Sequence, residues 1–492
     1  MKHFSLLFLI LTVFLGCSLV KPKVIPDKNL AAAVREQLDL DPNEPISEED
    51  LRELNFLMAV GRGIKKLDGL EKATNLMTLW LEQNEIRDIS PLADLTELDR
   101  LILPNNKIED ITPIAGLKQL THLELEQNKI KDITPLTGLK HLTHLELQQN
   151  QISDTTQLFA VLKTLTALSH LKLELNQITD VTPLTGLTQL TALWLYNCQN
   201  ADLTPLTEMK QLTQLSLYNC QITDTTLFAE MPQLTDLLLD KNKINDITPI
   251  AELTQLKTLS LGGNEIIDIT PLTGLTQLTF LSLGYNHIHD LTPLSELKQL
   301  THLILRYNPI KDIGPLGELK QLEHLSLENN QISDIAPLAR MTKLEFLLLK
   351  NNQISDIASL SGMTALGSVL LEGNQISDIA PLSGMTTLEG VSLEGNQISD
   401  VAPLANLTQL TYLILADNQI SDIAPLNKLT RLKALWLQHN QISNISIVEN
   451  FKNLTHLNIK ENPIRDMTPI RRLRKQIPHL ELNTENIYLT ER

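Results

Sequence analysis

The chain has 492 residues, of which 42% are hydrophobic and only 4% are aromatic, so aliphatic side chains must supply most of its core. It carries 41 basic and 58 acidic residues, which gives a net charge of −17 at pH 7. This balance argues against nucleic acid as the main partner, because a surface that binds phosphates should be basic.

The first 16 residues have the features of a signal peptide. A basic residue, Lys2, precedes an apolar run from Phe4 to Leu15. The run is too short to span a bilayer and has the length of a signal-peptide core. We therefore expect residues 1–16 to be removed and the chain to be exported.

A cysteine follows this segment directly. Gly16 and Cys17 resemble the small residue and cysteine of a bacterial lipobox, with Phe14 in place of the usual leucine. The resemblance implies that Cys17 is the lipid anchor and that residues 17–23 form a lipidated linker. Ser18 follows the cysteine, which by the sorting rule of such lipoproteins implies the outer membrane or the cell surface. The alternative is an ordinary signal peptide with an incidental cysteine.

Residues 24–56 are predicted to form a helical N-terminal cap. Asp27 is the expected N-cap of one helix, and Ser47-Glu48-Glu49-Asp50 is a capping box for a second helix that continues to Leu57. Two helices at this point would cover the open apolar end of the repeats that follow.

The loop between these helices carries several oxygen-bearing side chains. Asp39, Asp41, Asn43 and Asp50 have a spacing similar to positions one, three, five and twelve of a calcium-binding loop. Glu44 replaces the glycine that the sharp turn of such a loop needs. We therefore favour a structural loop without calcium, and these four residues remain the alternative metal ligands.

Residues 57–478 repeat with a period of 22. Asparagine or cysteine stands at eighteen positions from Asn84 to Asn462, which we call rungs, and the rungs are separated by sixteen steps of 22 residues and one of 26. Around each rung the residues read Leu-x-x-Leu-x-Leu-x-x-Asn-x-Ile-x-Asp-Ile-x-Pro-Leu. This pattern identifies a leucine-rich repeat.

The repeat predicts an α/β solenoid. Leu101 and Leu103 alternate with an outward residue, so each coil should contain a short strand. Stacked coils should form a curved, right-handed solenoid with a parallel sheet on the concave side and short 3-10 or helical turns on the convex side. We expect the rung asparagines to be buried and to satisfy backbone groups of the turn. Asp110 and its equivalents should bond the next turn, where Thr112 should cap a helical turn opened by Pro113.

The two ends of the repeat array are irregular. Arg62 stands 22 residues before Asn84, so the segment after residue 56 reads as a degenerate first repeat, and residues 479–492 read as a degenerate terminal repeat or cap. The basic cluster from Arg471 to Lys475 is expected to be a solvated face, with binding to an anionic surface as the alternative.

The repeat wording resembles that of a known family. The phrase Asn-Gln-Ile-Ser-Asp-Ile-Ala-Pro-Leu, which begins at Asn330 and occurs again from Asn374 and Asn418, resembles the internalin type of bacterial repeat, and the helical cap is similar to theirs. Internalins are surface proteins that bind host receptors. The chain shows no trailing immunoglobulin-like region and no wall-anchoring tail, so the resemblance implies the architecture and the binding mode but not a role in invasion.

Most aromatic residues occupy a few positions of the repeat. The positions six, four, two and one before each rung should lie on or beside the concave sheet face, and we call them the outward columns. Outside the signal segment ten of fifteen aromatics lie in these columns, where chance would place about three and strand propensity explains part of the excess. Exposed aromatics along one face are typical of a protein-binding surface. The ten are Trp80, Trp194, Tyr196, Tyr218, Phe280, Tyr285, Tyr307, Phe346, Tyr412 and Trp436.

Histidines form a second pattern in the column six before the rungs. The first three share their outward faces with glutamates, so stacked strands could create a stripe that binds a metal or titrates near pH 6. A straight column does not specify a tetrahedral site, and we favour a repeated Thr-His-Leu phrase on a solvated face. The histidines are His122, His144, His170, His302, His324 and His456, and the glutamates are Glu124, Glu146 and Glu174.

Cys198 and Cys220 occupy adjacent rungs. We expect two buried thiols in place of asparagine, and a disulfide between the rungs is the alternative.

The sequence contains no nucleophile elbow, no phosphate-binding glycine loop and no specific metal motif, so we predict neither an enzyme nor a cofactor. We predict a solenoid on the bacterial cell envelope that binds a protein and meets the membrane through its N-terminal lipid. Two alternatives are an intracellular scaffold similar to phosphatase-regulating repeats, which share the 22-residue period, and a carbohydrate or cell-wall binder that would use the same aromatics.

Overall fold

The computed structural model describes residues 24–483, apart from residues 175, 177–183, 185 and 199–201. The predicted signal peptide, Cys17 and its linker lie outside the described residues, as does most of the predicted terminal repeat. In the part of the chain that is described, no helix is long and apolar enough to cross a membrane. The chain divides into two compact units, one that ends at Tyr196 and one that begins at Asn197, and each is described by itself.

The first unit begins with the predicted cap of two helices, α2 (Lys28–Gln37) and α3 (Glu48–Glu53). Asp27 caps α2 as expected, because one of its carboxylate oxygens accepts hydrogen bonds from two N–H groups of the first turn. The other oxygen accepts from the N–H groups of Lys65 and Lys66, at 2.9 and 3.2 Å. This one side chain therefore also ties the cap to the first coil.

The second cap helix is shorter than predicted. The Ser47–Asp50 capping box is present, but α3 ends at Glu53 rather than at Leu57. The residues that follow form strand β1 (Phe56–Met58), which pairs with the next coil. The predicted end of the helix was wrong because strand β2 (Thr78–Trp80) of the next coil supplies a pairing partner for these residues, which helical spacing in the sequence does not reveal.

Among its described residues, the first unit then has seven parallel strands, paired in chain order from β1 to β7 (Ala192–Tyr196). The central leucines are in register, with Leu79 beside Leu101 and Leu101 beside Leu123, and all are buried. The strands are β1 (Phe56–Met58), β2 (Thr78–Trp80), β3 (Arg100–Ile102), β4 (His122–Glu124), β5 (His144–Glu146), β6 (His170–Lys172) and β7 (Ala192–Tyr196).

One coil of this unit holds the single step of 26 residues, between Asn150 and Asn176. Its four extra residues are accommodated by an α-helix, α4 (Thr155–Leu162), where most coils have a 3-10 turn of three or five residues. Asp154 caps this helix by accepting the N–H of Gln157 at 2.9 Å.

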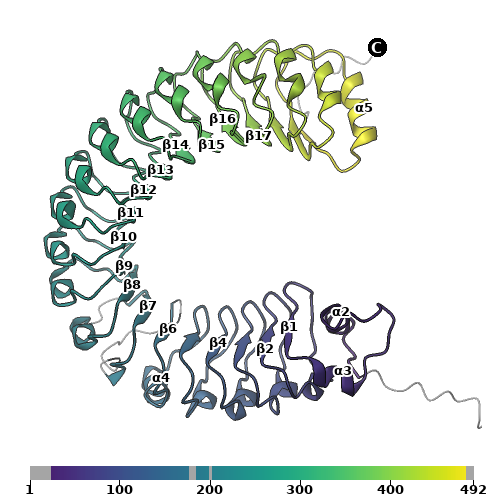
Figure 1. Cartoon of the computed structure of the whole chain (residues 1–492), viewed down its shortest axis with the longest axis vertical. Coiled ribbons are helices and arrows are strands. Elements are labelled where there is room, and N and C mark those ends of the chain that lie inside the picture. The colour runs from purple at the N-terminus through teal and green to yellow at the C-terminus, as the bar shows by residue number, and fades with distance from the viewer. Residues whose placement is uncertain (1–23, 175, 177–183, 185, 199–201, 484–492) are drawn as a thin grey trace, which may run out of the picture. The chain divides into compact units, whose positions relative to one another are not determined.

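In the part of the second unit that the structure describes, the same pattern continues with thirteen parallel strands and a helix, α5 (Thr468–Gln476). Within this unit the strands lie on the inner side and the 3-10 turns on the outer side, as predicted (Figure 1). The strands are β8 (Gln214–Tyr218), β9 (Asp236–Leu238), β10 (Thr258–Ser260), β11 (Phe280–Ser282), β12 (His302–Ile304), β13 (His324–Ser326), β14 (Phe346–Leu348), β15 (Ser368–Leu370), β16 (Gly390–Ser392), β17 (Tyr412–Ile414), β18 (Ala434–Trp436), β19 (His456–Asn458) and β20 (Glu481–Asn483).

The rung asparagines are buried and bonded as predicted. Asn286 is 5% exposed, and its Nδ2 donates to the carbonyl oxygens of Leu261 and Leu283, both at 3.0 Å. Its Oδ1 accepts the N–H of Ile266 at 3.0 Å. Leu261 and Ile266 belong to the preceding coil, so each rung joins two coils as well as closing its own turn.

The turn after each rung is also held by an aspartate. Asp110 Oδ1 accepts the N–H of Thr112 at 2.8 Å, and equivalent bonds occur in later coils, for example from Asp246 and Asp400. Thr112 was predicted to be the cap, but it is the first residue of the 3-10 turn Thr112–Gly116. The capping oxygen therefore comes from Asp110, two residues earlier.

Candidate binding surface

The ten aromatics of the outward columns all lie outside the core. Tyr285, Tyr307, Phe346 and Tyr412 are exposed, with exposed fractions of 48%, 45%, 38% and 51%. The other six are half-buried. The predicted strand register is therefore confirmed, because a shift by one residue would have turned these side chains into the core.

In the second unit the aromatics form stacks along consecutive coils. The rings of Tyr285 and Tyr307 are 4.3 Å apart, and Phe346 lies 4.2 Å from the ring of His324, which in turn lies 4.8 Å from His302. The stacks arise because one repeat position recurs on each neighbouring strand, and strands lie about 4.8 Å apart.

Three of the ten aromatics stand close to the boundary between the two units in the sequence. Trp194 and Tyr196 close the first unit, whereas Tyr218 belongs to the second. In the first unit the Lys172 ammonium lies 5.4 Å from the centre of the Trp194 ring. In the second, Lys241 lies 5.4 Å from the centre of the Tyr218 ring.

The first three histidines form a stacked column in the first unit. The ring of His144 lies 4.1 Å from that of His122 and 4.0 Å from that of His170. Burial, together with the two neighbouring imidazoles, lowers the pKa of His144 to about 4, and burial also lowers the pKa of His122 and His170. His144 therefore does not titrate near pH 6, and the rings of these three histidines are half-buried against each other rather than fully exposed to solvent.

Carboxylates lie beside these rings. Glu146 pairs with Lys172 at 2.7 Å, whereas burial raises the pKa of Glu124 and Glu174. This part of the strand surface is acidic and is built from long side chains.

The outward columns are hollowed at two consecutive coils of the second unit. Gly262 and Gly284 stand two residues before their rungs, where all other coils carry larger side chains, and Gly263 stands one before its rung. A hollow of about 590 Å³ opens above these glycines, and Tyr218, Asp240, Lys241, Tyr285 and Arg306 also line it. We call it the glycine hollow. The positions of the aromatic residues do not indicate this hollow, although glycine in an outward column is a signal in the sequence.

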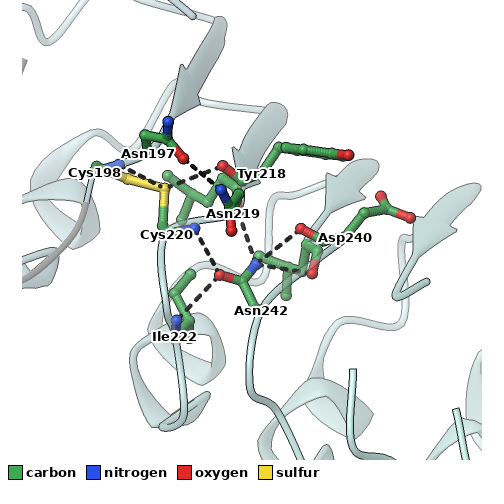
Figure 2. Close-up of a disulfide and its surroundings, with 10 residues drawn as sticks. Asn197, Cys198, Tyr218, Asn219, Cys220, Ile222, Asp240 and Asn242 are labelled. Atoms are coloured by element: carbon green, nitrogen blue, oxygen red, sulfur yellow. Dashed lines mark hydrogen bonds between the residues drawn. A yellow bond between two sulfur atoms is a disulfide. The ribbon is translucent and has the colours of Figure 1, made fainter. Parts of the chain in front are cut away.

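A disulfide joins the two cysteine rungs. Cys198 and Cys220 are bonded, so the prediction of two free thiols was wrong (Figure 2). Stacking places the same position of consecutive coils side by side, within reach of a sulfur–sulfur bond. The ladder resumes at once, because Asn242 Oδ1 accepts the N–H groups of Cys220 and Ile222 at 2.9 and 3.1 Å (Figure 2).

Of the four alternative calcium ligands, Asp50 lies on α3 and its side chain is bonded within the capping box. Asp50 Oδ2 accepts the N–H and the hydroxyl of Ser47, both at 2.7 Å, and Glu44 Oε2 accepts the N–H of Asp41 at 3.1 Å. Across the described residues, no group of three or more His, Cys, Asp or Glu is placed to hold a metal ion. The basic residues from Arg471 to Lys475 lie on α5 with exposed side chains.

The sequence matches the profile of the leucine-rich repeat family described as "Leucine Rich repeats (2 copies)". None of the curated proteins matches the chain significantly. The matched residues are 96–138, 118–160, 254–296, 298–340, 386–428, 408–449 and 430–472.

Several solved structures are similar. An internalin (InlF) from Listeria monocytogenes is 31% identical, with 80% of this chain and 96% of that chain covered and a TM-score of 0.40. The mouse RP105/MD-1 complex gives 21% identity, coverage of 89% and 81%, and a TM-score of 0.59. The ectodomain of the receptor kinase GASSHO1/SCHENGEN3 from Arabidopsis thaliana was solved in complex with CASPARIAN STRIP INTEGRITY FACTOR 2. It is 22% identical, with 85% of this chain and 54% of that chain covered and a TM-score of 0.58. Together with the stacked coils and their asparagine ladder, the profile match shows that the chain is a leucine-rich repeat protein.

Proposed function

We propose that this chain is a binding protein that holds a protein partner on the outward columns of its strands. The observation that carries the proposal is the exposure of Tyr285, Tyr307, Phe346 and Tyr412 on one face of the second unit. The repeat does not need aromatic residues there, because other coils carry Ser, Gly or Glu at the same positions. Aromatic side chains that become buried at an interface typically contribute a large share of the binding energy.

Two of the fold neighbours support a partner-binding role. The titles of the mouse and Arabidopsis structures describe complexes, with MD-1 and with CASPARIAN STRIP INTEGRITY FACTOR 2. A parallel sheet presented on one side of stacked coils offers a long surface for such contacts.

Affinity capture with the full chain tests this proposal, followed by measurement of the dissociation constant for the captured protein. Tyr285→Ser combined with Tyr412→Ser should weaken binding by up to roughly a thousandfold, because each anchor typically contributes about 2 kcal/mol, or roughly thirtyfold. Ile267→Ser is the matched control, because Ile267 is 55% exposed in the same unit but lies outside the outward columns. If the control weakens binding as much as the double variant, the partner does not bind at the outward columns. Capture of cell-wall glycan in place of protein would favour the carbohydrate alternative.

We further propose that the protein is displayed on the bacterial cell envelope through a lipid on Cys17. The sequence from Phe4 to Cys17 supports this proposal. The Cys198–Cys220 disulfide also supports export, because disulfides persist mainly in oxidising compartments. Cys17→Ala should release the chain from the membrane fraction or leave it unprocessed. Unchanged fractionation and processing of the variant would contradict a lipid anchor.

A further inference from the structure

The glycine hollow combines an open floor with two cationic side chains. In the column two before the rungs the residues of five consecutive coils are Tyr218, Asp240, Gly262, Gly284 and Arg306. The floor is low because the two middle coils have no side chain in this column. It is lined by Ser282 as well, and Ile304 closes it on the side of Arg306.

The backbone conformation does not require glycine here, so the effect of the glycines is to leave space above the strands. Gly263 has a φ of +67°, but Lys241 and Tyr285 adopt 55° and 57° at the same repeat position. A Cβ atom on Gly262 would lie 2.8 Å from Asp240 Oδ1, and one on Gly284 would lie 3.1 Å from Cγ of Arg306. Glycine at these positions therefore keeps the hollow open and lets Asp240 and Arg306 take the places that they have.

The charge at the hollow is positive, although the whole chain has a net charge of −17. Arg306 lies 5.4 Å from the centre of the Tyr285 ring, and Lys241 lies 5.4 Å from the centre of the Tyr218 ring. One acid, Asp240, lines the hollow too, but its Oδ1 is held by the Ser260 hydroxyl at 2.7 Å and by the Gly262 N–H at 3.0 Å. Burial also raises the pKa of Asp240. The hollow is therefore lined by two cations and by one acid, and an oxygen of that acid already accepts two hydrogen bonds.

The aromatic rings here suit a peptide better than a sugar. A sugar ring stacks on a free aromatic face, but Tyr307 already stacks on Tyr285 at 4.3 Å and Arg306 lies close to the same ring. The rings hold the cations in place, and the guanidinium can form two parallel hydrogen bonds with a carboxylate. The volume of about 590 Å³ is within the range of pockets that enclose a small ligand or a few peptide side chains.

We propose that the glycine hollow is the specificity site of the binding surface and receives an acidic side chain of a protein partner, whose carboxylate binds Arg306, while Lys241, three coils away, adds positive charge to the same hollow. This inference rests on the proposed function, because it names the chemistry that the partner must present at one place on the outward columns. The partner segment carries Asp or Glu, and the neighbouring part of that segment packs against Tyr285 and Tyr218.

A degenerate peptide library applied to the immobilised full chain tests the inference. Asp or Glu should be enriched at one peptide position, and replacing that residue by Asn or Gln in a selected peptide should weaken binding roughly tenfold or more, because charge-assisted hydrogen bonds are lost. Arg306→Gln with Lys241→Gln should abolish the preference for acid. Lys350→Gln is the matched control, because Lys350 stands two before its own rung, as Arg306 does, but outside the hollow.

A second variant fills the hollow without removing charge. Ser282→Leu should abolish peptide binding, and the fold should tolerate it, because Leu348 and Leu370 occupy the same repeat position in other coils. Circular dichroism and the unfolding midpoint check that each variant is folded. Peptide binding that survives in folded Ser282→Leu would contradict the assignment.

The outcomes separate this inference from the proposed function. If selected peptides bind through Tyr285 and Tyr412 but show no preference for Asp or Glu, the acidic side chain is wrong and the protein-binding surface stands. If oligogalacturonate or inorganic phosphate binds more tightly than any peptide, and Arg306→Gln removes that binding, the ligand is an acidic glycan or a free anion. If the library yields no enriched peptide at all, both proposals fail.

Discussion

The rung ladder and the outward columns use the same coils but differ in what they tolerate. At the rungs sixteen of eighteen residues are asparagine, and each one described is almost fully buried and bonded to two coils. In the column two before the rungs, only two residues away, Tyr, Asp, Gly, Arg, Glu and Lys all occur. The difference indicates that the fold restricts the positions whose polar atoms have no access to water, whereas the outward positions are free to carry recognition.

The largest change in stability is expected at the cysteine rungs. Replacing Cys198 and Cys220 by alanine removes a cross-link between residues 22 apart, so we expect a loss of about 3 kcal/mol in unfolding free energy. Replacing both by asparagine should recover part of this loss, because the amides can rejoin the ladder. Denaturant midpoints of the three proteins without reductant measure both effects. Equal midpoints for the two double variants would mean that asparagine stabilises these rungs no more than alanine does.

An asparagine rung should show the next largest effect. Asn286→Ala leaves the carbonyl groups of Leu261 and Leu283 and the N–H of Ile266 without their partner, which should cost on the order of 1–3 kcal/mol. Lys298→Ala changes an exposed side chain of the next turn and should cost little. Chemical denaturation compares the two, and similar midpoints would show that the rung is dispensable.

The stacked histidines should show a smaller effect that depends on pH. The pKa of His144 is about 4 in the folded chain, below the ordinary value of 6.5, so the unfolded chain takes up the proton first as the pH falls. The folded state therefore loses stability between about pH 6.5 and 4. Because the ring is only half-buried, solvent screens the effect, and we expect roughly 1 kcal/mol.

The variant His144→Gln should remove this part of the pH dependence. Glu124 and Glu174 have raised pKa values and act in the opposite direction, so the informative quantity is the difference between wild type and variant. Urea unfolding at several pH values between 7 and 4 measures it. A constant difference across that range would show that His144 does not resist protonation in the folded chain.

The exposed aromatics should show the smallest effect on stability. Tyr412→Ser removes a side chain that is 51% exposed, so the unfolding free energy should change by about 0.5 kcal/mol or less. The melting temperature should therefore stay almost unchanged. Leu413→Ala, at the adjacent inward position, should cost about 2–5 kcal/mol because Leu413 is fully buried. If the two variants melt alike, the division between inward and outward positions does not hold at β17.

Four features could be predicted from the amino-acid sequence alone. They are the leucine-rich repeat, the buried asparagines, the helix starts at Asp27 and at the capping box, and the outward direction of the aromatics. These features follow from local geometry, because a strand alternates its faces and a period of 22 returns every position to the same place on the next coil. The contacts between neighbouring coils could be established only from the three-dimensional structure. It joined Cys198 to Cys220, stacked His144 between two imidazoles, ended α3 before β1 and opened the glycine hollow beside Arg306. Each of these depends on distances between residues about 22 apart in the sequence, which the repeat implies but which only packed side chains and backbone establish.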